Sequence, residues 1–119
     1  MEQLCAKMGE FVKMETELPF PDFQAYYQEV MDYLQKNYQD MTDEQLVQAK
    51  GITMIMGSNA NMRSLRKDEN RKKFQKMAQK SNFWENAIKL RLTKAGMTEQ
   101  ELDEKVGALW TDTAADEAE

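Results

Sequence analysis

The sequence contains no histidine, and this absence removes several kinds of chemistry at once. Histidine is the commonest general base, the usual switch near neutral pH and the commonest metal ligand. With one cysteine besides, the chain cannot supply the four ligands of most structural zinc sites, nor the Glu-x-x-His motifs of di-iron bundles. We therefore expect no metal site, no cofactor and no catalytic residues, and the protein is predicted not to be an enzyme.

The single cysteine, Cys5, also excludes an internal disulfide. Small secreted domains usually carry several cysteines, so a reducing compartment is expected. The chain opens with an early acid, Glu2, and lacks the basic-then-apolar pattern of a secretion signal. No run approaches the ~18 apolar residues that a membrane-spanning helix needs. These features predict a cytoplasmic protein that has no membrane partner.

Helix-breaking residues are also few, with two prolines and five glycines among 119 residues. Apolar residues recur at steps of three and four in five stretches, which is the period of an amphipathic helix. We predict an all-α, single-domain bundle over residues 1–110, built from four to five helices. They are expected at about 2–17, 21–38, 42–62, 67–95 and 99–110. The small and acidic residues 111–119 predict a flexible tail.

Two short segments give the start of a helix directly. The hexapeptides at 41–46 and 97–102 are near copies, each beginning Met-Thr and ending in leucine. In each, the threonine can accept from the first free amides, and the glutamine or glutamate three residues later can reach back. The methionine before the cap can also pack on the leucine. Each hexapeptide therefore predicts a capping box with a hydrophobic staple.

Residues 57–66 allow two interpretations. The run from Gly57 to Asn61 is small and polar, so it fits a loop, or a helix that approaches a neighbour closely. Met62 and Leu65 extend the apolar stripe that passes through Ile55, which favours a continuing helix.

Charge is strongly segregated along the chain. Residues 63–94 carry a net charge of +8, whereas residues 1–62 carry −6 and residues 95–119 carry −7, so the whole chain has −5. A row of cations on one helical face can follow a phosphate backbone or an acidic protein. It can equally be a solvated face, or one that pairs with acids of the same chain. The candidate residues for a polyanion or acidic-partner face are Arg63, Arg66, Lys67, Arg71, Lys72, Lys73, Lys76 and Lys80.

The fourth predicted helix carries a second apolar stripe, formed by Phe83, Ala87 and Leu90, nearly opposite its main one. The helix predicted at 99–110 can fold back on this stripe, or the stripe can serve self-association. The ten methionines suit an adaptable core, and at a surface they suit a permissive binding groove.

Together these patterns favour a non-enzymatic helical module that binds a protein partner or itself as a homo-oligomer. The alternative is an accessory protein that binds nucleic acid through the basic face of residues 63–80. The overall negative charge disfavours this alternative, because dedicated nucleic-acid binders are usually basic.

Overall fold

The computed structural model describes the backbone of residues 1–118 and the side chains of residues 1–110. Within this part, the chain forms five α-helices and one 3-10 turn and contains no strand, which confirms the predicted all-α fold. The elements are α1 (Glu2–Lys13), α2 (Phe20–Asn37), η1 (Tyr38–Asp40), α3 (Asp43–Ser64), α4 (Arg71–Lys94) and α5 (Glu99–Ala118).

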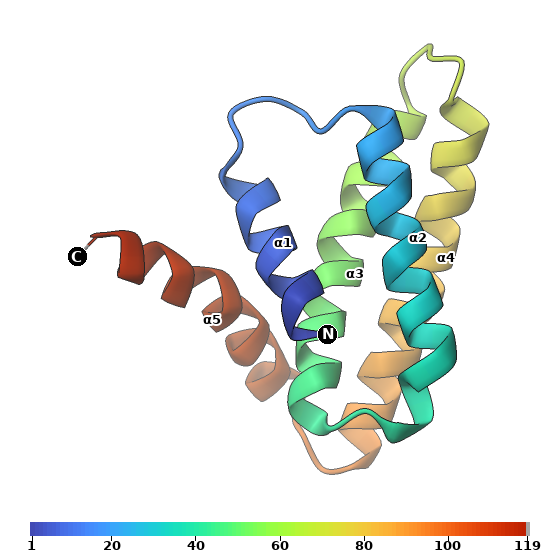
Figure 1. Ribbon diagram of the computed structural model, residues 1–119. Coiled ribbons are helices and arrows are strands. Elements are labelled where there is room, and N and C mark those ends of the chain that lie inside the picture. Colours follow the sequence, from blue (N-terminus) through green and yellow to red (C-terminus); the bar gives the residue numbers. More distant parts are fainter. Residues whose placement is uncertain (119) are drawn as a thin grey trace.

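The helix α3 lies in the middle of the bundle (Figure 1). Its neighbour α4 runs antiparallel beside it, α2 packs over both, and α1 and α5 lie on the other side of α3. Aromatic side chains join these layers. Phe23 of α2 meets the ring of Phe74 of α4 at 5.7 Å, and Phe11 of α1 meets that of Tyr26 of α2 at 5.0 Å.

Helix ends follow the predicted local signals closely. At the start of α3, Thr42 and Gln45 form the complete capping box, with bonds of 3.2 and 3.0 Å. At the start of α5, Thr98 accepts from the amide of Glu101, whose carboxylate meets the threonine hydroxyl instead of the backbone. The helix α4 ends at Lys94, and Gly96, two residues later, has φ of 109°, a conformation that favours glycine.

Two predicted boundaries were wrong. The first helix ends at Lys13 rather than near residue 17, because Met14 turns into the extended region. The fourth begins at Arg71 rather than 67, after a turn in which the Asp68 carboxylate accepts from the amide of Asn70 at 2.7 Å. In contrast, α3 continues to Ser64, so most of residues 57–66 are helical.

The position of α5 depends on Gly51 of α3. A β-carbon at this glycine would lie 2.9 Å from Leu109 and 3.2 Å from Trp110, so α5 approaches α3 where a side chain is missing. The predicted flexible tail, residues 111–119, falls outside the described side chains, and residue 119 lies outside the described backbone. None of the described helices has the length and apolar character needed to cross a membrane.

Candidate binding face on α4

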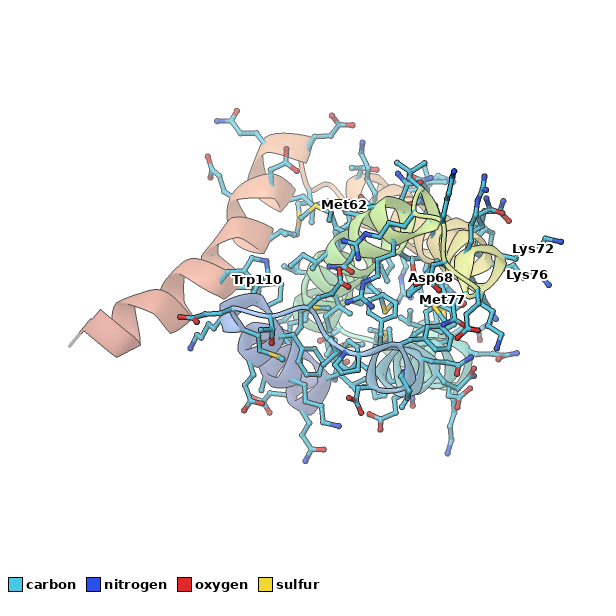
Figure 2. The ribbon with its side chains drawn as sticks, turned by 90° about the horizontal axis from the view of Figure 1, so that it is seen from above. Met62, Asp68, Lys72, Lys76, Met77 and Trp110 are labelled. Carbon is cyan, nitrogen blue, oxygen red and sulfur yellow. The ribbon has the colours of Figure 1, made fainter. Side chains whose placement is uncertain are left out.

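Five of the eight predicted cations lie on α4, whereas Arg66 and Lys67 lie in the turn before it and Arg63 lies in α3. Lys72, Lys76 and Lys80 are spaced by four, so they share one side of the helix, and all three are exposed. Figure 2 shows Lys72 and Lys76 pointing away from the bundle, on the side opposite Trp110. The core-facing side of the same helix carries the buried residues Phe74 and Met77.

Seven of the eight predicted cations are exposed, but two of the seven are engaged within the chain. Arg66 forms an ion pair of 2.7 Å with Glu17, and the ammonium of Lys73 lies 5.5 Å from the ring centre of Phe20. The side chains of the other five have no hydrogen bond or ion pair with any described residue, and they are Lys67, Arg71, Lys72, Lys76 and Lys80. We call these five residues the basic row.

Arg63 does not belong to this face, so its predicted place there was wrong. Its side chain is buried, with the residue only 3% exposed. The guanidinium donates to the carbonyl of Leu18 at 2.6 Å and lies 3.4 Å from the Glu17 carboxylate. The rings of Phe23 and Phe74 flank it at 5.0 and 5.4 Å. Burial lowers the pKa of Arg63, with the Glu17 charge acting in the opposite direction.

The predicted apolar stripe continues the basic row along the same outer side of α4. Phe83 is 65% exposed and Leu90 is 55% exposed, whereas Ala87 is partly buried. The carbonyl of Ala87 accepts from the hydroxyl of Tyr38 at 3.2 Å. Because α5 packs on α3, the stripe keeps its solvent exposure. We call Phe83 and Leu90 the apolar end of the face.

The described part of α5 begins near the C-terminal end of α4, whereas the basic row lies at the N-terminal end of that helix. In Figure 1, α5 and α4 lie on opposite sides of α3. The described acids of α5 include Glu99, which pairs with Lys89 near the end of α4 at 3.1 Å. No described residue of α5 pairs with the basic row. Ion pairs still join the basic segment to its acidic neighbours, because Glu17 pairs with Arg63 and Arg66 and Glu99 pairs with Lys89, but none of these pairs involves the basic row.

Sequence reasoning missed that Arg91 has a structural role. Its guanidinium donates to three carbonyls where α2 and η1 end, namely those of Tyr38, Gln39 (3.4 Å) and Met41 (3.2 Å). It also stacks on the Tyr38 ring, 4.8 Å from its centre. An isolated arginine in a basic segment gives no sequence signal for this role, because the partners are 50 to 53 positions away.

The described residues contain no group of three or more histidine, cysteine, aspartate or glutamate side chains placed to hold a metal ion. The one cysteine, Cys5, is partly buried, and burial raises the pKa of its thiol. Comparison with models of protein families, with curated proteins and with solved structures found no match.

Proposed function

We propose that this chain is a non-enzymatic protein-binding module, and that the outer face of α4 binds an acidic, amphipathic helix of a protein partner. The observation that carries the proposal is that cationic and apolar side chains follow each other along one side of α4. Unpaired cations occupy the N-terminal half of the line, and exposed Phe83 and Leu90 occupy the C-terminal half.

The dimensions of the face fit a helical partner. The line from Lys72 to Leu90 covers five helical turns, or about 27 Å at about 1.5 Å per residue. A partner helix lying along it would place acids over the lysines and apolar residues over Phe83. Charged groups at such an interface mainly set orientation and the rate of encounter, while a buried aromatic anchor supplies most of the affinity.

Nucleic-acid binding is the second candidate, and the basic row is the observation that favours it. Five unpaired cations can follow a phosphate backbone and release its counterions. The apolar end has no matching surface on a duplex, and the chain as a whole carries −5. A single strand offers unpaired bases that can stack on Phe83. Single-stranded probes therefore test nucleic-acid binding more stringently than duplex probes do.

Fluorescence anisotropy with defined probes can separate the two candidates. The protein probe is a labelled synthetic helix with a leucine stripe and glutamates on its flanks, and its control has the same residues in scrambled order. Single- and double-stranded DNA and RNA of similar length form the second set. Each probe is titrated at about 50 and 150 mM salt, because phosphate contacts weaken steeply over this range.

Two variants assign any binding to the face. The triple change Lys72→Gln, Lys76→Gln and Lys80→Gln removes charge, and Phe83→Ala removes the aromatic anchor. A matched control changes Lys7, Lys36 and Lys105 to glutamine, which removes the same charge away from α4. We expect Phe83→Ala to weaken binding of the acidic helix probe about tenfold or more, since burying an aromatic side chain contributes about 1.5–3 kcal/mol.

The result expected from the proposal is binding of the amphipathic helix at both salt concentrations, with loss in both face variants and retention in the control. Tighter binding of nucleic acid would favour the second candidate. For duplex DNA, the triple variant should then reduce the steepness of the plot of log binding constant against log salt concentration by about 2.7, at about 0.9 for each lost phosphate contact. No binding of any probe, or equal binding of the scrambled peptide, would overturn the proposal.

A further inference from the structure

A separate cavity of about 320 Å³ opens between α1, the loop of residues 14–18, α2 and α3. Its volume is at the lower end of the range of about 300–1,000 Å³ that is typical of small-molecule sites. No residue of α4 lines it, so it is distinct from the face described above.

The walls of the cavity are largely apolar. Tyr26 also lines it, but its hydroxyl already donates to the carbonyl of Leu4 at 2.7 Å, so the tyrosine contributes its ring. The apolar wall residues are Met8, Phe11, Val12, Met14, Leu18, Phe23, Ile55 and Met56. Such a lining favours a ligand whose body is apolar.

Five polar or charged side chains also line the cavity, namely Glu15, Thr16 and Glu17 of the loop and Asn59 and Arg63 of α3. The two from α3 carry the buried polar atoms of interest. They are four residues apart, so they share one side of the helix. The Asn59 Oδ1 and the Arg63 Nε are buried, and neither has a hydrogen-bond partner. Arg63 Nε lies 3.4 Å from a Glu17 oxygen, but this ion pair is not aligned as a hydrogen bond. A buried polar atom without a partner destabilises a fold, so a partner for both atoms is expected.

The charges around the cavity disfavour an anionic ligand. Glu17 balances the guanidinium of Arg63 and also pairs with Arg66 at 2.7 Å. A second carboxylate, that of Glu15, lies in the exposed part of the lining. A ligand with a negative charge would therefore meet one balanced arginine and two carboxylates.

We propose that this cavity binds a small, neutral, mainly apolar molecule with one group that both donates and accepts a hydrogen bond, such as an alcohol, a phenol or a primary amide. The group donates to Asn59 Oδ1 and accepts from Arg63 Nε–H, while its apolar body packs between Phe11, Phe23 and Ile55. Ordered water is the competing partner for the same two atoms.

The methionines allow a direct test by NMR of the full chain labelled with ¹³C in the methionine methyl groups. Met8, Met14 and Met56 line the cavity, whereas Met54 and Met62 are exposed elsewhere on α3. The probes are 4-propylphenol, its methyl ether 4-propylanisole, and 4-propylbenzoate. The ether keeps the shape and the acceptor but cannot donate, and the benzoate is anionic.

We expect 4-propylphenol to give saturable shifts at the three cavity methionines. The ether should bind about tenfold more weakly, because one buried hydrogen bond contributes about 1 kcal/mol and Asn59 is left unpaired. The benzoate should bind more weakly than the phenol. No shifts at millimolar phenol would mean that the cavity holds water only. Equal binding of phenol and ether, or shifts confined to Met54 and Met62, would also overturn the proposal.

Two variants assign the binding to the cavity. Val12 is 50% exposed at the rim, so Val12→Trp can fill the opening without disturbing the core and should abolish binding. Asn59→Leu removes the acceptor and should make phenol and ether bind equally. Leu65→Trp, at an exposed position outside the lining, is the matched control and should bind like the wild type. Unchanged phenol binding in a folded Val12→Trp variant would place the ligand elsewhere.

Discussion

The ion pair between Lys50 of α3 and Glu85 of α4 is the most deeply placed charge interaction among the described residues. The two groups lie 2.9 Å apart, and their side chains are 8% and 24% exposed, respectively. The pair therefore joins the two helices at the centre of the bundle. Because the lysine is more buried than the glutamate, the two single substitutions should have unequal effects.

We expect Glu85→Leu to lower the free energy of unfolding by about 2–3 kcal/mol, because it leaves the Lys50 ammonium buried without a counter-charge. Breaking a fully buried pair costs about 3–5 kcal/mol, and the partial exposure of Glu85 reduces that figure. Lys50→Met should cost about 1 kcal/mol, since the remaining carboxylate can reach water. The double variant Lys50→Met/Glu85→Leu should stay within about 1 kcal/mol of the wild type, because two apolar side chains can replace a buried pair.

Urea unfolding, followed by circular dichroism and by tryptophan fluorescence, measures all four proteins of this cycle. With a slope of about 1–3 kcal/mol per molar urea, Glu85→Leu should lower the midpoint by about 1–2 M. Coincident transitions from the two probes would justify the two-state treatment. A Glu85→Leu variant as stable as the wild type within about 0.5 kcal/mol would contradict a buried, uncompensated Lys50 charge, and so would a double variant that loses the sum of the two single effects.

Three further predictions concern groups whose surroundings the structure defines. Arg91→Met, which removes the donor to three carbonyls at the end of η1, should lower the free energy of unfolding by about 1.5–3 kcal/mol, with Arg91→Lys intermediate in urea unfolding. Burial raises the pKa of Tyr26 and of Tyr27. The unfolded chain therefore loses these protons first, and the urea midpoint should hold up to the ordinary tyrosine pKa of about 10 and fall above it. Burial also raises the pKa of the Cys5 thiol, so a disulfide reagent at pH 8 should label it several-fold more slowly than in the urea-unfolded chain, and equal rates would contradict this.

The helices could be predicted from the sequence because their signals are local. Steps of three and four along α2, the capping box at Thr42 and the left-handed Gly96 each involve residues within one or two turns. The end of α1 was misplaced because its cause is distant. Arg63 of α3 and Arg66 in the turn after it form ion pairs with Glu17 of the loop after α1, and no pattern near residue 14 indicates these contacts.

The candidate sites divide in the same way. The helical period correctly placed Lys72, Lys76 and Phe83 on the outside of α4, because a face of one helix is a local property. The period cannot tell which cation of a basic run turns inward, and Arg63 did so because two phenylalanine rings and a backbone carbonyl receive it. The cavity could not be predicted, since residues 8–26 enclose it together with residues 55–63 of α3, and no local pattern indicates that these two segments meet.

The outer face of α4 is exposed because α5 buries its own apolar residues against a different helix. After the turn at Gly96, α5 could have folded back on Phe83 and Leu90, which would have covered the face. The missing side chain at Gly51 instead lets Leu109 and Trp110 pack against α3. Because α5 is acidic, its packing against α3 also keeps negative charge away from the basic row. The side chains of the basic row therefore have no ion-pair partner among the described residues. The same packing contact thus accounts for both the apolar and the charged part of the proposed binding surface.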